Sequence, residues 1–216
     1  HWPDRRMSMF GADGLGYKHY EAETIPILET LKVLSDLVKA GKIRYIGLSN
    51  ETPWGLSEFI KYSEMLDLPR VVSVQNAYNF LNRTYELGMS EFHHRSQVGL
   101  LAYSPLAQGY LSGTYIDGAR PAGARTTLFE RGDRYEIPEA NEAIKSYVNY
   151  ARSINMDPSV MANAFVNTRD FVTSNIIGAT SMEQLKLAID SIDVKLSEED
   201  LKQIDLIHRS NPNICP

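Results

Sequence analysis

The sequence has little of what would place it among secreted, membrane-embedded or nucleic-acid-binding proteins. It contains one cysteine, Cys215, which excludes disulfide frameworks and cysteine-based metal sites. No stretch approaches the ~18 consecutive apolar residues that a membrane helix needs. The 22 basic residues are outnumbered by 27 acidic ones and form no basic run. We therefore expect no nucleic-acid partner and no membrane partner.

The beginning of the chain also lacks the pattern of a secretory signal. The opening His1-Trp2-Pro3-Asp4 is not followed by a charged segment with an apolar core, so a cytoplasmic location is expected. The first residue is His rather than Met, and we expect a piece of a longer polypeptide. No metal site is expected, because the pair His93-His94 has no third ligand at helical or strand spacing.

What the chain does have is the composition of an ordinary globular domain. Its 216 residues are 43% hydrophobic and 23% charged, which is sufficient to bury a core. The Gly-rich segment 107–134 shows no clear periodicity, whereas short strand patterns and helical patterns alternate over the rest. Strands are expected at 43–48, 71–74, 99–103 and 174–177, and helices at 22–40, 53–63, 83–97, 138–153, 158–168, 182–192 and from 197 onward.

Residues at the ends of these segments support the assignment. Gly41 follows the first helix at the position where a left-handed cap favours glycine. Thr52 and Pro53 are typical of a helix N-cap and of the first helical position. Ser181 and Gln184 have the spacing of a capping box. We therefore expect a helix to start at each of these last two places.

Strands that alternate with helices indicate parallel βαβ units, which makes the fold class α/β. Polar residues follow each expected strand, and in parallel α/β folds the active site forms at the carboxyl ends of the strands. These residues are Ser49-Asn50, Gln75-Asn76, Ser104 and Thr180-Ser181. No strand here is followed by the G-x-G-x-x-G fingerprint of a dinucleotide-binding open sheet. A barrel is therefore favoured, and small-residue loops at 104–113 and 178–184 follow its last two strands, where barrels place phosphate sites.

Five groups of residues together resemble the aldo-keto reductases. They are His1-Trp2-Pro3-Asp4, the segment 41–50 (GKIRYIGLSN), Gln75-Asn76, the segment 103–106 (YSPL) with Gly109, and the segment 177–180 (IGAT) followed by EQL at 183–185. Within that superfamily the chain is most similar to the bacterial Tas-type branch, which is related to the potassium-channel β-subunits. The resemblance implies a single domain over residues 1–216. It also implies a partial (β/α)8 TIM barrel, from the end of strand 4 through strand 8 and the C-terminal helix, with strands 1–3 absent.

The resemblance implies an NADP(H)-dependent oxidoreductase that reduces aldehyde or ketone carbonyls of small substrates. Its catalytic tetrad is Asp, Tyr, Lys and His, and the histidine that orients the substrate carbonyl matches His1. Nothing in this sequence matches the other three, so the proton donor that carbonyl reduction requires is not among these residues.

The resemblance also implies where the cofactor lies. Ser49, Asn50 and Gln75 match the residues that hold the nicotinamide carboxamide, and Tyr103 matches the aromatic side chain on which the nicotinamide stacks. The pyrophosphate loop is matched by Ser104, Pro105, Leu106, Gln108, Gly109, Leu111, Ser112 and Gly113. The adenosine end is matched by Gly178, Thr180, Ser181 and Gln184.

The chain departs from the family pattern at two positions. Thr114 stands where relatives often have Lys after the pyrophosphate loop, and Ala188 stands where an Asn commonly meets the adenine. Both changes weaken the expected hold on NADP(H). Arg125 is a candidate to supply the compensating charge.

Other interpretations of these residues stay open. The strand-end side chains have a structural interpretation as caps, and Tyr103 has one as an ordinary barrel-lining residue. A nucleotide-binding regulatory module of the channel β-subunit type is the alternative function. His1 favours the enzyme, because a binding module does not need an imidazole that orients a carbonyl. An aldolase-type barrel is disfavoured, since no lysine stands at a strand end to form a Schiff base.

Residues 1–216 alone are expected neither to turn over substrate nor to fold as a stable monomer. About half a barrel exposes two sheet edges and its inner face, and such surfaces lead to aggregation or to pairing with another chain. A homo-oligomer is one expected outcome.

Overall fold

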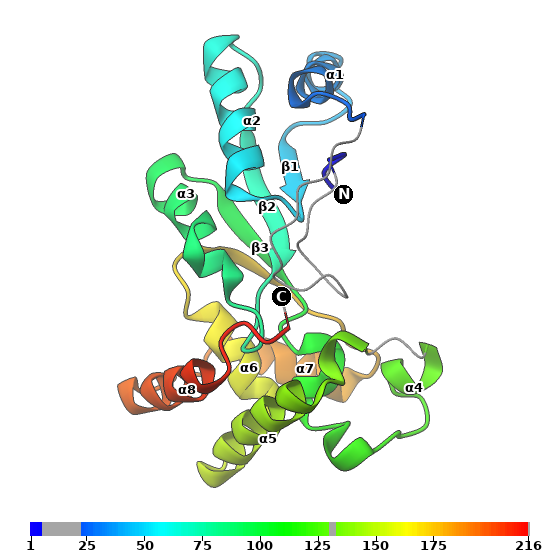
Figure 1. Ribbon diagram of the computed structural model, residues 1–216, viewed down its shortest axis with the longest axis vertical. Helices are drawn as coiled ribbons and strands as arrows, with labels where there is room; N and C mark the ends of the chain where they lie inside the picture. The colour runs from blue at the N-terminus through cyan, green and yellow to red at the C-terminus, as the bar shows by residue number, and fades with distance from the viewer. Residues whose placement is uncertain (6–22, 130–132, 216) are drawn as a thin grey trace.

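The computed structural model describes residues 1–5, 23–129 and 133–215, and its centre is a parallel sheet (Figure 1). The strands are β1 (Ile46–Ser49), β2 (Val71–Ala77), β3 (Gly99–Tyr103) and β4 (Val172–Ile176). They lie in the order β1-β2-β3-β4, and every neighbouring pair is parallel. The α/β prediction is confirmed. Strands that neighbour one another in sequence order are consistent with part of a (β/α)8 barrel, since a doubly wound sheet reverses its order at a switch point.

Helices connect the strands; those that precede β3 lie above and beside the sheet in Figure 1, and those that follow β3 lie mostly below it. The α-helices are α1 (Ile27–Lys39), α2 (Pro53–Met65), α3 (Met89–Ser96), α4 (Arg125–Phe129), α5 (Pro138–Ser153), α6 (Pro158–Asn167), α7 (Met182–Asp190) and α8 (Glu198–Ser210). Short 3-10 helices are η2 (Thr84–Leu87), η3 (Ala107–Ser112), η4 (Ile116–Gly118) and η5 (Asp133–Tyr135).

The two faces of the sheet differ in burial. Helices α2, α3 and α6 contact one face, where Val74 and Leu100 are fully buried. The opposite face carries Ser49, Gln75 and Tyr103, which are only partly buried. Because side chains alternate between the faces of a strand, these three side chains share the accessible face.

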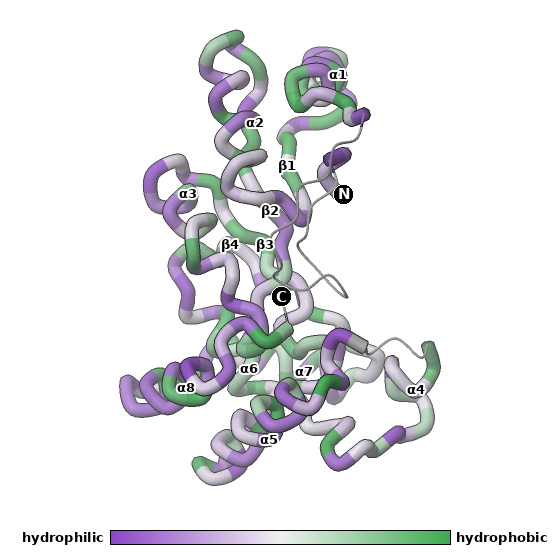
Figure 2. The backbone as a smooth tube through the Cα atoms, viewed as in Figure 1, coloured by the Kyte–Doolittle hydropathy of each residue, from purple (hydrophilic) through white to green (hydrophobic). Residues whose placement is uncertain are grey.

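Aromatic packing joins the end of β2 to the helical layer. Phe80 stacks on Tyr147 of α5 with ring centroids 4.4 Å apart, and it lies 4.7 Å from the ring of Phe165 of α6. All three rings are buried, and such pairs contribute about 0.5–1.5 kcal/mol each beyond the area that they bury. Figure 2 shows hydrophilic and hydrophobic stretches alternating along α5 and α8, as expected for helices with one face on this core and one in solvent.

Most of the predicted elements are present. The strand at 99–103 and the helix at 138–153 have the predicted bounds. Gly41 has a positive φ of 68° after α1, and the side chain of Thr52 accepts a hydrogen bond from the Gly55 amide at the start of α2. These caps could be predicted from the sequence because each depends on one residue type at one position.

Other predictions need correction. The single helix predicted at 83–97 is divided into η2 and α3 at Gly88, whose backbone conformation is not helical. The last strand lies at Val172–Ile176 rather than at 174–177, since Val172 pairs with Leu100 of β3. Helix α1 begins only after Pro26, and residue 22 of its predicted range lies outside the described residues. Residues 1–3, where the resemblance implies the end of strand 4, have no regular secondary structure.

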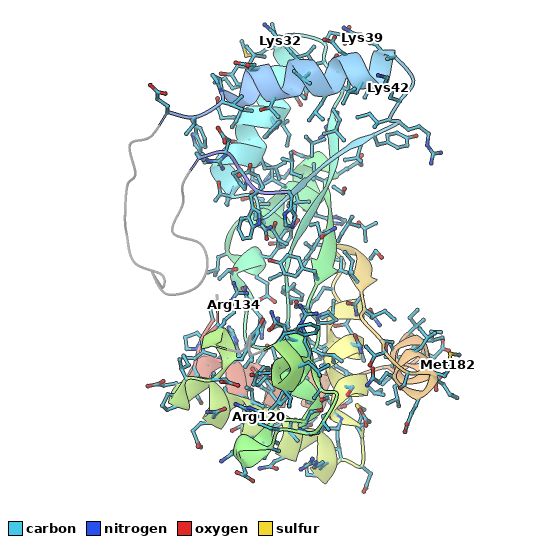
Figure 3. The ribbon with its side chains drawn as sticks, turned by 90° about the vertical axis from the view of Figure 1, so that its right-hand side faces the viewer. Lys32, Lys39, Lys42, Arg120, Arg134 and Met182 are labelled. Atoms are coloured by element: carbon cyan, nitrogen blue, oxygen red, sulfur yellow. The ribbon has the colours of Figure 1, made fainter. Side chains whose placement is uncertain are left out.

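Apolar side chains are exposed on α7, which follows the edge strand β4, and just beyond its end. Met182, Ile189 and Ile192 are 78%, 56% and 72% exposed, and Met182 lies at the outer side of the molecule in Figure 3. Both β1 and β4 have one neighbouring strand within the described part of the chain. No helix in that part has the length and apolar character needed to cross a membrane.

These exposed surfaces predict that residues 1–216 alone associate with one another. Light scattering coupled to size-exclusion chromatography should give a mass of at least twice 24.4 kDa. Replacing Ile189 with Lys should lower that mass, because it puts a charge on the apolar surface of α7. Leu87→Lys, at an exposed position on η2, is the matched control and should change nothing. A stable species with the mass of one chain would contradict the prediction.

Candidate functional site

The strand pairing brings the predicted site residues to one edge of the sheet. Ser49 at the end of β1 is in register with Gln75 of β2. Tyr103 at the end of β3 is in register with Ala77 of β2 and with Ile176 of β4. The residues that follow the four strands therefore begin side by side, as the sequence predicts for parallel strands.

Asn50 connects the ends of β1 and β3. Its φ of 53° is left-handed, and its side chain is almost fully buried. The Asn50 Oδ1 accepts a hydrogen bond of 2.7 Å from the Tyr103 hydroxyl, and Asn50 Nδ2 donates to Ser49 Oγ at 3.3 Å. The Ser49 hydroxyl and the backbone N–H of Asn50 both donate to the backbone oxygen of Gln75 at 3.0 Å. Four of the predicted site residues thus form one hydrogen-bonded group.

His1 joins this group through its backbone. Its carbonyl oxygen accepts a hydrogen bond of 3.2 Å from Asn50 Nδ2. The imidazole ring is exposed and lies edge-on to the ring of Trp2, with centroids 5.9 Å apart. The structure therefore places the candidate catalytic histidine beside the candidate nicotinamide residues.

The protonation state of Tyr103 fits its role as a hydrogen-bond donor. Burial raises the pKa of the Tyr103 hydroxyl, and the positive charge of Arg134 opposes this only in part. The hydroxyl is therefore protonated at neutral pH and donates to Asn50. Arg134 lies where the sheet meets the lower helices (Figure 3), and its guanidinium faces the ring of Tyr135 at 6.0 Å.

The segment after β3 has an unusual backbone. Ser104, Ala107 and Gln108 have φ between 48° and 59°, and Gly109 and Gly113 have φ of 100° and 84°. Non-glycine residues rarely adopt such angles, and a series of them costs free energy that the surrounding structure must offset. Ala107, Gln108 and Gly109 are left-handed in succession, and the N–H groups of Ala107, Gly109 and Gly113 donate to backbone oxygens of the same loop.

The side chains of this segment divide into two groups. Leu111 and Pro105 are buried, so their side chains belong to the core. Only the backbone of these two residues can contact a ligand. Gln108 and Ser112 are partly accessible. The Ser112 hydroxyl donates to the Gly109 oxygen at 2.7 Å and lies 2.6 Å from the Thr114 hydroxyl, so these two groups help to fix the loop.

The segment after β4 is exposed and ends at the start of α7. The Ser181 side chain caps this helix by accepting a hydrogen bond of 3.2 Å from the Gln184 amide. The predicted capping box is only half correct, because Gln184 Oε1 accepts from Thr180, at 2.9 Å from its amide and 3.1 Å from its hydroxyl. Nothing lies within 4 Å of where a Cβ on Gly178 would stand, so the approach to this loop is open.

Arg125 stands apart from the group around Asn50. It is exposed at the first position of α4, and this short helix contacts η3. Arg125 is therefore brought to the loop of η3 rather than into the strand-end network.

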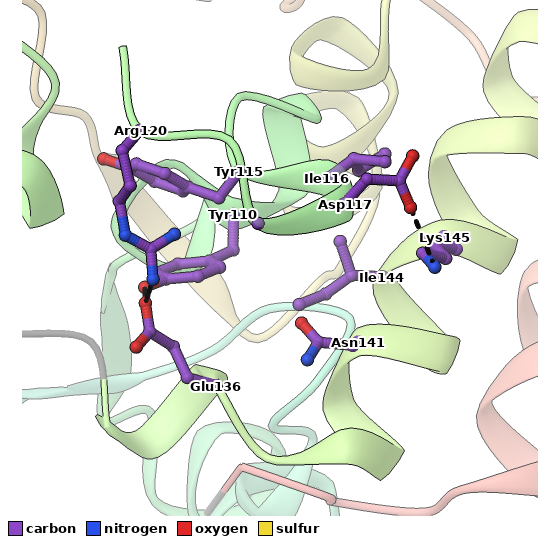
Figure 4. Close-up of a pocket in the computed structure, with 10 residues that line it drawn as sticks. Tyr110, Tyr115, Ile116, Asp117, Arg120, Glu136, Asn141, Ile144 and Lys145 are labelled. Atoms are coloured by element: carbon purple, nitrogen blue, oxygen red, sulfur yellow. Dashed lines mark hydrogen bonds and ion pairs between the residues drawn. The ribbon is translucent and has the colours of Figure 1, made fainter. Parts of the chain in front are cut away.

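A cavity of about 370 Å³ lies behind the loop of η3 (Figure 4). Tyr110, Ile116 and Ile144 line its middle. Ion pairs stand at two sides, from Arg120 to Glu136 at 2.7 Å and from Lys145 to Asp117 at 3.0 Å. None of the predicted site residues lines it, so the cavity is separate from the strand-end site.

Two buried asparagines support the strand-end site, and sequence reasoning assigned a role in it to neither of them. The Asn76 side chain binds both backbone groups of Glu51, at 3.1 and 2.9 Å. Asn79 is fully buried and donates to the Ser104 oxygen at 2.9 Å. The signal was present for Asn76, since it follows Gln75 at the strand end, whereas nothing in the spacing singles out Asn79.

The sequence matches the aldo/keto reductase family over residues 1–209. The chain belongs to this family. It is 45% identical to Protein tas of Escherichia coli over 210 residues, which are 97% of this chain and 60% of that protein. It is 34% identical to an aldo-keto reductase of Babesia bovis, covering 96% of this chain and 78% of that protein. An L-glyceraldehyde 3-phosphate reductase of Escherichia coli is 29% identical, covering 93% of this chain and 59% of that protein.

Family membership confirms the resemblance. The chain spans about 60% of the length of Protein tas, so the activity of the whole protein is a matter for proposal. Family membership shows that the chain is related to oxidoreductases. Its α/β fold is consistent with part of the family barrel.

The loop of η3 yields a stability prediction that uses two glycines. Gly113→Ala and Gly118→Ala both put a Cβ on a left-handed residue, which costs about 1–2 kcal/mol. A Cβ on Gly113 would also stand 3.2 Å from Val148 Cγ1 and from Arg152 Nη2, whereas one on Gly118 would meet nothing within 4 Å. Thermal unfolding should therefore show a larger loss for Gly113→Ala. Equal losses would mean that the loop does not pack tightly on α5.

Proposed function

We propose that the chain is the cofactor-binding part of an oxidoreductase that uses NADPH to reduce the carbonyl group of a small aldehyde or ketone. The observation that carries this proposal is the hydrogen-bonded group in which the Tyr103 hydroxyl and the His1 carbonyl both bind the Asn50 side chain. It joins the candidate catalytic residue to the candidate nicotinamide residues. In this assignment β1–β4 are strands 5–8 of the barrel and His1 marks the end of strand 4.

The strand-end side chains fit a nicotinamide. A carboxamide has an acceptor oxygen and donor hydrogens. The side chains of Ser49, Asn50 and Gln75 carry both donors for that oxygen and acceptors for those hydrogens. Tyr103 presents an aromatic ring at the same edge, and the partial burial of that ring leaves a surface for stacking. A dinucleotide bound here would compete with the Tyr103 hydroxyl for Asn50 Oδ1.

The two loops fit the phosphates. The segment from Ser104 to Gly113 carries no acidic side chain that would repel a pyrophosphate, and the small, partly accessible residues Gly109 and Ser112 allow a ligand to approach its backbone closely. The amino end of α7 and the hydroxyls of Thr180 and Ser181 suit the 2′-phosphate that distinguishes NADP(H) from NAD(H). The hydroxyl of Thr114 is committed to Ser112, so it does not replace the lysine of relatives.

In the proposed reaction His1 orients the substrate carbonyl. NADPH supplies the hydride when it is bound. The exposed imidazole has ring nitrogens that can hydrogen-bond the carbonyl oxygen. A proton donor is also needed, and the Asp, Tyr and Lys of the family tetrad have no match in this sequence. We therefore assign turnover to a protein that also carries those three residues.

The names of relatives support this class of substrate. One relative is named an L-glyceraldehyde 3-phosphate reductase, and a relative from Schizosaccharomyces pombe, 31% identical over 179 residues, is named a putative aryl-alcohol dehydrogenase. Both names describe interconversion of a carbonyl and an alcohol. The same chemistry is proposed for this chain, with no particular substrate assigned.

Replacing the ring of Tyr103 tests the cofactor site directly. Tyr103→Ala should weaken NADPH binding by about 1–3 kcal/mol, because it removes the stacking surface. Tyr103→Phe keeps the ring, loses only the hydrogen bond to Asn50, and should bind nearly as well as the original chain. Fluorescence titration with NADPH measures both. Equal dissociation constants for the original chain and Tyr103→Ala would leave Tyr103 as an ordinary lining residue.

Turnover distinguishes the enzyme from a regulatory module. The whole protein, with a complete tetrad, should oxidise NADPH in the presence of small aldehydes or quinone-like carbonyls, and faster than NADH. The preference should be modest because Thr114 and Ala188 depart from the family pattern. Tight NADPH binding without consumption would favour the regulatory module. A preference for NADH of about tenfold, or 1.4 kcal/mol, would contradict the assignment of the 2′-phosphate site.

A further inference from the structure

The segment from His1 to Arg5 is attached to the end of β1 at two points. The His1 carbonyl accepts from Asn50 Nδ2, as described above. At the other end, the Arg5 guanidinium forms an ion pair with Glu51, the residue that follows Asn50. Arg5 also donates to the Thr52 hydroxyl at 2.9 Å. Two adjacent residues, Asn50 and Glu51, thus hold both ends of one short segment.

Glu51 is an unusual partner for a surface segment, because its side chain is only 3% exposed. Its carboxylate accepts from the Thr52 amide at 2.6 Å and from Arg5 Nη1 at 3.3 Å. Its backbone is bound by the Asn76 side chain. A buried carboxylate needs a charged partner, since the cost of removing it from water is several kcal/mol when it stands alone. Arg5 is its ion-pair partner among the described residues.

The packing around this ion pair is tight. The Arg5 guanidinium lies 4.9 Å from the ring centroid of Trp54, within the range of a cation–π interaction. A Cβ on Gly55 would collide with the Arg5 guanidinium and with the Glu51 carboxylate. The first turn of α2 is therefore shaped to accept the Arg5 side chain.

We propose that Arg5 is a positioning residue, whose ion pair with the buried Glu51 holds the His1 segment against Asn50 and so sets the geometry of the nicotinamide site. This inference rests on the proposed function for its link to NADPH. The attachment itself is independent of it. Release of Arg5 would free the backbone of His1 and remove one of the hydrogen bonds that fix the Asn50 side chain.

The two tryptophans of the chain allow the attachment to be measured without NADPH. Trp2 lies within the segment and Trp54 lies under Arg5, so quenching of tryptophan fluorescence by acrylamide reports how firmly the segment is held. Arg5→Gln should increase quenching and should raise the NADPH dissociation constant about tenfold. Arg5→Lys keeps the charge but loses the forked geometry, and it should restore most of both properties.

Matched variants complete the test. Glu58→Gln removes a partly exposed carboxylate on the same helix, whose ion-pair partner among the described residues is Lys61, and it should change neither measurement. Glu51→Gln should reproduce Arg5→Gln. If Arg5→Gln is quenched no more than Glu58→Gln, the segment is not held by Arg5 and the inference is wrong. It is also wrong if Arg5→Gln increases quenching while leaving NADPH affinity unchanged. If the original chain binds no NADPH, the proposed function fails, and the quenching series still decides whether Arg5 holds the segment.

Discussion

The side chain of Asn50 ties together three parts of the chain that are distant in sequence. It binds the His1 backbone, the Ser49 hydroxyl beside it and the Tyr103 hydroxyl at the end of β3. Its left-handed backbone turns the chain from β1 toward α2, so the same residue shapes the turn and fills it. Asparagine suits both tasks, because it tolerates the left-handed region and carries both a donor and an acceptor. Because Asn50 is buried, these hydrogen bonds are shielded from water, and they hold the residues of the candidate site together at the strand ends.

A second constraint acts on the loop after β3. Three non-glycine residues with positive φ are costly, and the surrounding packing offsets that cost. The buried Tyr110 ring lies 4.5 Å from Tyr115 and 5.3 Å from Tyr135, which anchors the loop to residues on both sides. The Asn79 side chain holds the Ser104 oxygen from the direction of β2. The loop that we propose binds the pyrophosphate is thus held in shape by the core as well as by its own residues.

Much of the fold followed from the sequence, because strands, helix caps and polar strand ends are local patterns. The strand at 99–103 and the caps at Thr52 and Ser181 each depend on neighbouring residues. The division of the helix at 83–97 was missed, since the conformation of Gly88 depends on how η2 packs. The partner of Gln184 was missed because Thr180 and Ser181 are equally plausible from spacing alone.

For the candidate site, the sequence proposes which residues belong to it but not how they contact one another. Parallel strands place Ser49, Gln75 and Tyr103 on one edge, and the resemblance named them. The ion pair between Arg5 and Glu51 joins residues that are 46 positions apart, and no periodicity connects them. Likewise, nothing in the residues 104–108 shows that three of them lie in the left-handed region. Long-range pairs and backbone strain are properties of the packed chain.

The central claim is that the carboxyl edge of the sheet and its two loops hold one NADPH molecule. An amide NMR titration of the whole protein with NADPH tests it most directly, because each residue reports separately. The account predicts shifts that saturate together for Asn50, Gln75, Tyr103, the segment 104–113 and the segment 178–184. Shifts confined to the cavity around Tyr115 and Asp117, or no saturable shifts at all, would contradict it.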